Sequence, residues 1–155
     1  MQVKTMPPMQ VLYTRTQTTL ADLSKFIGKT PFTLYAEATR AQLLPAGPQY
    51  WFYYGADGKP DTVFTLEIVL PVSGRAIREF SDTSFQIKKT EPFKYIAAIH
   101  EGDWAQLHVT YAKIFNEIFS KGYKPLTPNE CREMYINVDF DNKDNNVTEV
   151  RIGIE

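Results

Sequence analysis

Cysteine, histidine and glycine are scarce in this 155-residue chain, which contains one cysteine, two histidines and eight glycines. A single thiol, Cys131, cannot make an internal disulfide. Together with His100 and His108 it provides too few soft ligands for a closed four-ligand zinc site without added carboxylates. No glycine-rich loop stands between a strand and a helix, where a phosphate or a dinucleotide would bind. We therefore expect no metal and no cofactor.

An excess of charge of one sign is also missing. The chain has 17 basic and 18 acidic side chains, a net charge of -1, which offers no broad basic surface for a phosphate backbone. The longest apolar stretch, 63–72, includes Thr65 and Glu67 and is far shorter than the ~20 residues that cross a bilayer. Nothing resembles a secretory signal. These absences predict a cytoplasmic protein with no direct nucleic-acid partner and no membrane partner.

Apolar and aromatic residues are plentiful, at 43% and 14% of the chain. A chain of this length buries roughly 70% of the surface that its unfolded form exposes, which is enough for one core. The sequence therefore predicts a single domain over 1–155. Residues 1–8 contain Pro7 and Pro8 and lack periodicity, so we expect them to form a loose lead-in.

Two segments have the apolar spacing of helices. The first covers roughly residues 19–43, and Pro31 predicts a break near 28–31 because it lacks an N–H and its ring clashes with the preceding turn. The second begins after Asp103, whose side chain can cap the first turn. Seven segments have the composition of strands: 10–16, 50–54, 63–70, 85–88, 93–100, 131–138 and 147–154.

These elements occur in the same order twice, as strand, helix, strand, turn and strand, over approximately 10–72 and 93–154. Tyr54 precedes Glu67 by 13 positions (67 − 54), and Tyr135 precedes Glu149 by 14 (149 − 135), so the two hairpins match with one residue of slack. The predicted fold class is α+β, with duplicated β-α-β-β halves related by a pseudo-twofold axis. We expect an antiparallel sheet with two main helices on one face and a ligand cleft on the other.

Alternation along the predicted strands assigns side chains to the two faces. The apolar positions of 63–70 and 147–154 go under the helices, which leaves Glu67 on the open face. In 131–138, Met134, Ile136 and Val138 are expected in the helix-covered core. Glu133 and Tyr135 then share the open face, and the match between hairpins adds Phe52 beside Glu133. A carboxylate is therefore predicted among aromatic rings.

Such a site suits a lipophilic cation, because aromatic faces supply apolar area with a negative quadrupole and the carboxylate supplies a counter-charge. The alternative is that the aromatics are ordinary strand formers and that Glu133 pairs with Arg132, Arg151 or a backbone donor. Cys131, His100 and His108 are interpreted as structural. The candidate ligand-binding residues are Glu133, Tyr135, Phe52, Tyr54, Trp51, Trp104, Tyr111 and Glu67.

Three segments together resemble the GyrI-like small-molecule-binding domain, also called the bacterial transcription activator effector-binding domain. They are residues 99–107 (IHEGDWAQL), 132–135 (REMY) and 65–72 (TLEIVLPV). Asp103 departs from the pattern, since other members often carry proline there. The resemblance implies a duplicated fold with a cleft between its halves, and a family glutamate that falls on Glu133.

The resemblance also implies a choice of functions. Members include sensor domains of AraC-type and MerR-type multidrug regulators, gyrase inhibitors, and stand-alone domains, some of which hydrolyse cyclopropane-bearing compounds. We favour a stand-alone binder of lipophilic cations, because the aromatic strand lies beside Glu133. We expect no operator binding, because no residues remain ahead of the first strand for a helix-turn-helix reader. The alternatives are a cofactor-free hydrolase using Glu133 with Tyr135 or Tyr54 as proton donor, and a protein-binding regulator of gyrase or transcription with an unknown partner.

Overall fold

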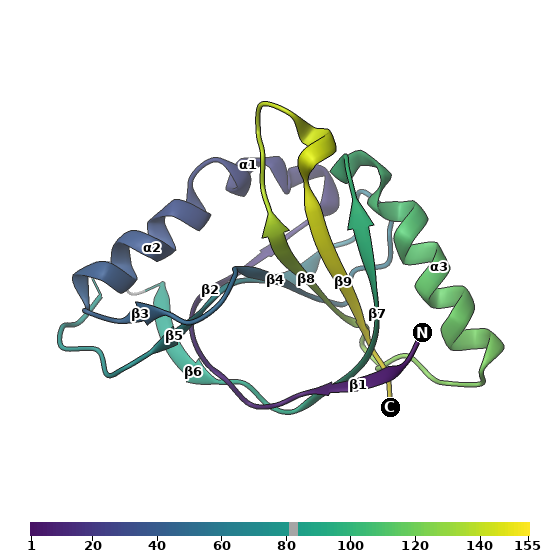
Figure 1. Cartoon of the computed structure of the whole chain (residues 1–155), viewed down its shortest axis with the longest axis horizontal. Coiled ribbons are helices and arrows are strands. Elements are labelled where there is room, and N and C mark those ends of the chain that lie inside the picture. The colour runs from purple at the N-terminus through teal and green to yellow at the C-terminus, as the bar shows by residue number, and fades with distance from the viewer. Residues whose placement is uncertain (81–83) are drawn as a thin grey trace.

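The computed structural model describes residues 1–80 and 84–155. It is a mixed α+β fold built on one nine-stranded antiparallel sheet (Figure 1), which confirms the predicted fold class. Eight strands follow the order β1-β7-β9-β8-β4-β5-β2-β6, and β3 pairs with β5 beside this path. The strands are β1 (Val3–Met6), β2 (Gln10–Thr18), β3 (Leu44–Pro45), β4 (Tyr50–Tyr54), β5 (Phe64–Ser73), β6 (Phe85–Lys89), β7 (Phe93–Glu101), β8 (Glu130–Asn137) and β9 (Val147–Gly153).

The helices begin where the sequence signals predict, whereas the first helical segment ends at Arg40, short of the expected residue 43. A 3-10 turn η1 (Leu20–Asp22) leads into α1 (Ser24–Ile27), and α2 (Thr30–Arg40) starts with a proline in its first turn. The expected break near Pro31 is confirmed. In the second half, Asp103 accepts a hydrogen bond from the N–H of Ala105 at the start of η2 (Trp104–Gln106), which continues into α3 (Leu107–Ser120). A last 3-10 turn, η3 (Lys143–Asn145), lies between β8 and β9.

The helix-covered face holds the larger core. Leu66 and Ile68 of β5 and Val150 and Ile152 of β9 are at most 1% exposed and pack under the helices, as alternation predicts. Ile118 joins them from α3. No helix in the described residues 1–80 and 84–155 is long and apolar enough to cross a membrane.

The opposite face is closed rather than open. The sheet curls until the two chain segments at its ends meet, where the N–H of Thr90 donates to the carbonyl of Met9 at 2.9 Å and the N–H of Met9 donates to the Thr90 hydroxyl at 3.0 Å (Figure 1). Residues 3–6 are strand β1 and pair with β7, so the expected loose lead-in is wrong for them. A second apolar cluster fills the concave side: Met6, Val11, Tyr13, Tyr50, Phe52, Val69, Phe93 and Tyr95.

The strand registers show how the two halves correspond. Phe52 pairs with Glu67 between β4 and β5, and Met134 pairs with Glu149 between β8 and β9, so both members shift by 82 positions (134 − 52 and 149 − 67). The two halves join where β4 pairs with β8, and there Trp51 lies directly opposite Glu133. These two positions also differ by 82 (133 − 51). The pseudo-twofold axis therefore passes between Trp51 and Glu133.

Candidate functional site

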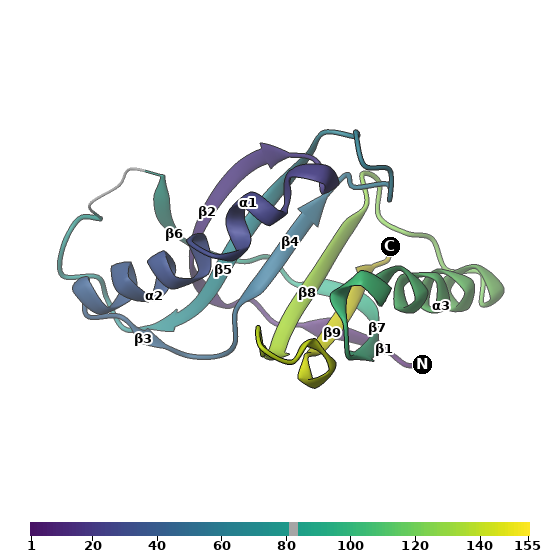
Figure 2. The same ribbon diagram turned by 90° about the horizontal axis from the view of Figure 1, so that it is seen from above.

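A large pocket, built from described residues, lies on the helix-bearing side of the sheet. Seen from above (Figure 2), α1 and α2 stand on one side of β4 and β8, and α3 stands on the other. Between them is a cavity of about 1120 Å³. The cleft was predicted on the opposite face, and that prediction is wrong. The helices cover the outer strands and leave the central pair uncovered, whereas the other face is filled by the second apolar cluster.

Glu133 forms part of the pocket wall where the two halves join. Its side chain is buried, with 5% of the residue exposed, and both carboxylate oxygens accept hydrogen bonds from tyrosines. The hydroxyls of Tyr135 and Tyr53 donate to Oε1 at 2.7 and 3.0 Å, and the hydroxyl of Tyr111 donates to Oε2 at 2.6 Å. A carboxylate has about four acceptor positions, so the three tyrosines leave roughly one for another donor.

No described lysine or arginine lies within ion-pair distance of Glu133. Burial raises the pKa of its carboxyl group above the ordinary value, although the hydrogen bonds from Tyr111, Tyr135 and Tyr53 oppose the shift. The pKa values of the three tyrosines are raised well above normal, first by burial and also by the nearby Glu133 charge. The tyrosines therefore remain hydroxyl donors. The sequence alternative in which Glu133 pairs with Arg132 or Arg151 is not what the structure shows.

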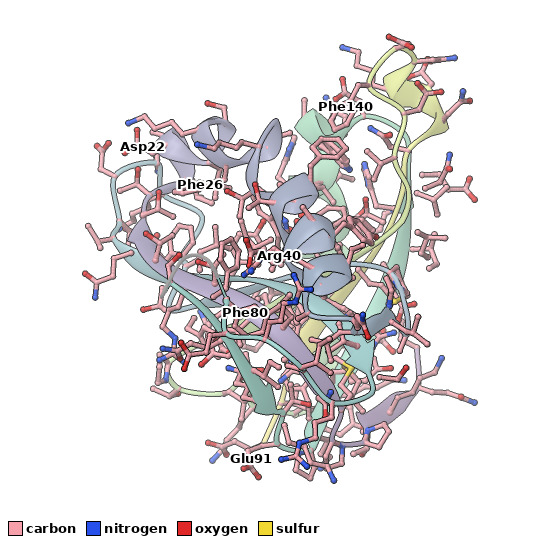
Figure 3. The ribbon with its side chains drawn as sticks, turned by 90° about the vertical axis from the view of Figure 1, so that its left-hand side faces the viewer. Asp22, Phe26, Arg40, Phe80, Glu91 and Phe140 are labelled. Atoms are coloured by element: carbon pink, nitrogen blue, oxygen red, sulfur yellow. The ribbon has the colours of Figure 1, made fainter. Side chains whose placement is uncertain are left out.

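Aromatic rings wall the pocket around this carboxylate. Trp51 and Trp104 both pack edge-on against Tyr135, with centroids 5.9 and 5.8 Å apart, and Trp104 also meets Phe140 at 6.2 Å. The indole N–H of Trp104 donates to the Thr148 hydroxyl at 3.0 Å, which fixes its ring. Figure 3 shows Phe140 on the β8–β9 hairpin, where its side chain is 60% exposed at the pocket mouth.

Five of the eight predicted site residues therefore come together at this pocket: Trp51, Trp104, Tyr111, Glu133 and Tyr135. The other three do not. Phe52 and Tyr54 pack with the second apolar cluster on the opposite face, and Tyr54 donates to Glu67 at 2.7 Å. A hydrolase using Glu133 thus keeps Tyr135 as a neighbouring hydroxyl but cannot use Tyr54.

The misplacement has a simple geometric origin. The sequence match paired Tyr54 with Tyr135, whereas the registers make Tyr53 the counterpart of Tyr135, 82 positions earlier (135 − 53). A one-residue slip moves every side chain of a strand to the other face. Tyr53, a direct partner of Glu133, was missed for this reason. The equal 82-residue spacing from Glu67 to Glu149 is the signal that identifies it.

The expected core positions of β8 are also wrong, because alternation of its apolar residues assigned them to the wrong face. Met134 lies on the opposite face, against the second apolar cluster. A bulge between Tyr135 and Asn137 then disturbs the alternation, so Ile136 lines the pocket mouth, where it is 49% exposed. Val138 lines it too and is 42% exposed. Ile136 and Val138 are therefore not buried core residues.

Glu67 is completely buried in a different network. Its carboxylate accepts hydrogen bonds from Lys88 at 2.7 and 2.8 Å and from Arg15 at 2.8 and 3.0 Å, besides that from Tyr54. Burial alone would raise the pKa of this carboxyl group, but Lys88, Tyr54 and Arg15 outweigh it and lower the pKa. Glu67 is thus an ion-paired structural residue, which corrects its place among the pocket candidates.

The remaining chemistry-bearing side chains have local roles. Cys131 lines the pocket, and burial raises the pKa of its thiol to about 12. His100 donates from Nε2 to the carbonyl of Asp103 at 2.8 Å, and its Nδ1 lies 2.7 Å from the Thr110 hydroxyl. His108 lies in the pocket wall. Within the part of the chain that the structure describes, no group of three or more His, Cys, Asp or Glu residues could hold a metal ion.

A curved antiparallel sheet in two similar halves, with a large apolar pocket and one acid where the halves join, defines a small-molecule-binding domain. The chain belongs to the GyrI-like small molecule binding domain family, whose family model matches residues 1–155. The resemblance inferred from three short segments is thereby confirmed. No curated protein matches the chain.

Solved structures with the same fold include the C-terminal domain of EcmrR, with a TM-score of 0.78 and 21% identity over 99% of this chain and 96% of that one. The EcmrR–DNA complex also gives 0.78, with 20% identity; the alignment covers 99% of this chain but only 56% of the EcmrR chain. SAV2435 bound to tetraphenylphosphonium gives 0.65, with 9% identity over 99% and 93%. At these identities the likeness shows the fold.

Proposed function

We propose that the protein binds lipophilic organic cations in the pocket between its two halves, with Glu133 as the counter-charge. The observation that carries this proposal is a buried carboxylate with no cationic partner among the described residues, set in a wall of aromatic rings. A buried charge is costly unless something compensates it. A bound cation would provide that compensation.

The size and lining of the pocket favour a bulky ligand. Its volume of about 1120 Å³ lies slightly above the roughly 300–1,000 Å³ that is usual for pockets of drug-sized ligands. The edge-on contacts of Trp51 and Trp104 with Tyr135 leave ring surface for apolar and cation–π contacts. SAV2435, which shares the fold, is bound to tetraphenylphosphonium, and this supports the same ligand class here.

The hydrogen bonds of Glu133 indicate which kind of organic cation the pocket would prefer. Three tyrosine hydroxyls already occupy most of its acceptor positions. A primary ammonium ion would need to displace one or more of these donors to satisfy its own three N–H groups. A quaternary or delocalised cation has no such requirement, so we expect it to bind better than a primary amine of similar size.

Tetraphenylphosphonium and tetraphenylborate test the proposal, because they have nearly the same shape and opposite charge. Titration calorimetry should give a much lower Kd for the cation, and triphenylphosphine oxide, which is neutral, should lie between them. Equal affinity for the two ions would refute the role of charge. Failure of all three compounds to bind would refute the pocket as a site for lipophilic ligands.

The balanced charge bears on the choice between a binding domain and a DNA-contacting protein. EcmrR is seen in complex with DNA, and its chain extends well beyond the part that matches this one. Here 17 basic and 18 acidic residues give a net charge of -1, with no excess of positive charge to attract a phosphate backbone. We infer that the domain itself recognises the small molecule and makes no direct contact with nucleic acid. A gel-shift series at low salt tests this inference, and a shifted band would contradict it.

A further inference from the structure

A second, smaller cavity lies against the outer part of the sheet. It has a volume of about 330 Å³ and is enclosed by β2, β5, β6 and the α1–α2 segment. The same segment is therefore a wall of two cavities. Leu23 and Ile27 face the large pocket, whereas Phe26 and Lys29 face the small one. Figure 3 views the molecule from this side and labels Phe26 on α1.

The lining of the small cavity is unusual for this face of the sheet. Alternation along β2 places Thr14 and Thr16 on the helix-bearing side, whereas the buried positions of β5 on that side are phenylalanine, leucine, isoleucine and valine. Thr14 and Thr16 are partly buried, so this side of β2 changes from the apolar Leu12 to two polar side chains at the cavity. Thr30, Thr33 and Ser84 add three more hydroxyl groups to the lining.

The remainder of the lining is apolar and cationic. Phe26, Ile68 and Phe85 provide hydrocarbon surface, of which Ile68 and Phe85 are buried. Lys25 and Lys29 contribute the charged groups. No aspartate or glutamate lines the cavity, within the residues described.

The two lysines are not fully neutralised by neighbours. Lys25 lies 3.1 Å from Asp22 in a solvent-exposed pair. Lys29 has no carboxylate within ion-pair distance in residues 1–80 and 84–155. It is also the N-cap of the 11-residue helix α2 and makes no side-chain capping bond there, so the positive end of that helix adds to the field of the two ammonium groups.

We propose that this second cavity binds a small organic acid. Its carboxylate would lie at Lys25, Lys29 and the start of α2, with the hydroxyls of Thr14 and Thr30 as further donors, and its hydrocarbon body would pack on Phe26 and Phe85. The charge preference is opposite to that of the large pocket. The proposal is independent of the function proposed for Glu133, because the two cavities share only the α1–α2 wall.

Benzoate is a suitable probe, with benzamide and benzylamine as neutral and cationic partners of the same shape. In two-dimensional NMR titrations of the full chain, benzoate should cause saturable shifts in Thr14, Thr16, Lys25, Lys29 and Thr33, which line the small cavity and not the large pocket. Benzamide and benzylamine should cause none there. Shifts that map to the large pocket, or no saturable shifts at all, would overturn the proposal.

A charge-removing variant sharpens the test. Lys25→Gln/Lys29→Gln changes only exposed side chains and should weaken benzoate binding by about fivefold or more, as expected for the loss of two exposed ionic partners. Lys113→Gln, an exposed lysine on α3 outside both cavities, is the matched control and should leave the affinity unchanged. Equal weakening by the control would reduce the effect to net charge and overturn the assignment of the site.

Discussion

Glu133→Gln removes the negative charge of the large pocket and keeps nearly the same side-chain shape. Glu133 is 5% exposed, so solvent screens the attraction of its carboxylate for a bound cation only in part. For a charge separation of roughly 6 Å and an effective dielectric constant of about 20, that attraction is ~2.8 kcal/mol, or about a hundredfold in Kd. We therefore expect the variant to bind tetraphenylphosphonium about a hundredfold more weakly.

Two tryptophans make the measurement direct. Trp51 and Trp104 both line the pocket, so quenching of their fluorescence reports occupancy, and titration calorimetry gives an independent Kd. Glu149→Gln is the matched control, because it makes the same substitution outside the pocket. Glu149 pairs with Met134, next to Glu133 in β8, so its side chain lies on the opposite face of the sheet, where it forms an ion pair with Arg151 at 2.9 Å. The control should bind like the wild type.

The discriminating result is the ratio of affinities for cation and anion. Glu133→Gln should reduce the preference for tetraphenylphosphonium over tetraphenylborate, because the substitution lowers the affinity for the cation and raises the affinity for the anion. If the variant binds the cation within threefold of the wild type, the carboxylate contributes little and the electrostatic argument fails. If both ions weaken together, the substitution has damaged the pocket shape instead.

Four further results follow from the same structure. Affinity for the cation should fall as pH decreases from about 8 to about 4, starting above the range of an ordinary carboxyl group because burial raises the pKa of Glu133; Glu133→Gln should give a flat profile in the same titrations. Because the folded-state pKa is raised, protonation of Glu133 stabilises the fold below its unfolded pKa, and this stabilisation is lost as pH rises through the folded pKa. Scanning calorimetry should thus show the Tm of the wild type falling relative to Glu133→Gln over that window. Glu67→Gln should lower the free energy of unfolding by ~2 kcal/mol in urea melts. This loss is smaller than for a fully buried ion pair, because Arg15 and Lys88 reach solvent. An unchanged urea midpoint would contradict the structural role of this network. Gly153→Ala should cost ~1–3 kcal/mol, since a Cβ there would lie 2.6 Å from side-chain atoms of Leu126 and Phe93, and a variant as stable as the wild type would show that these side chains can move aside.

The elements of the fold were accessible from sequence because their signals are local. Pro31 fixes the break before α2, Asp103 caps the turn before α3, and alternation assigns β5 and β9 to the correct face. The lead-in was misjudged because β1 has only four residues, and its pairing with β7 depends on chain some 90 positions away (96 − 3). Short edge strands carry little pattern of their own.

The site was harder to place because β4 gives no contrast between its faces. All five of its residues are aromatic, so a slip of one position leaves the pattern unchanged but exchanges Tyr53 for Tyr54. Alternation assigns Glu67 to the correct face, but that face is filled by the second apolar cluster rather than open, so Glu67 is buried. Its partners Arg15 and Lys88 come from other strands, and the sequence does not show that they meet.

The pseudo-twofold axis between Trp51 and Glu133 has an implication for how such a pocket can arise. In a symmetric pair of separate, identical chains, any residue beside the axis would face its own copy, giving two glutamates in mutual repulsion or two tryptophans with no charge between them. Only the covalent fusion of two copies frees these positions to diverge. A chain that contains both halves can thus place a single glutamate opposite a tryptophan at the axis, whereas a homodimer of identical halves cannot.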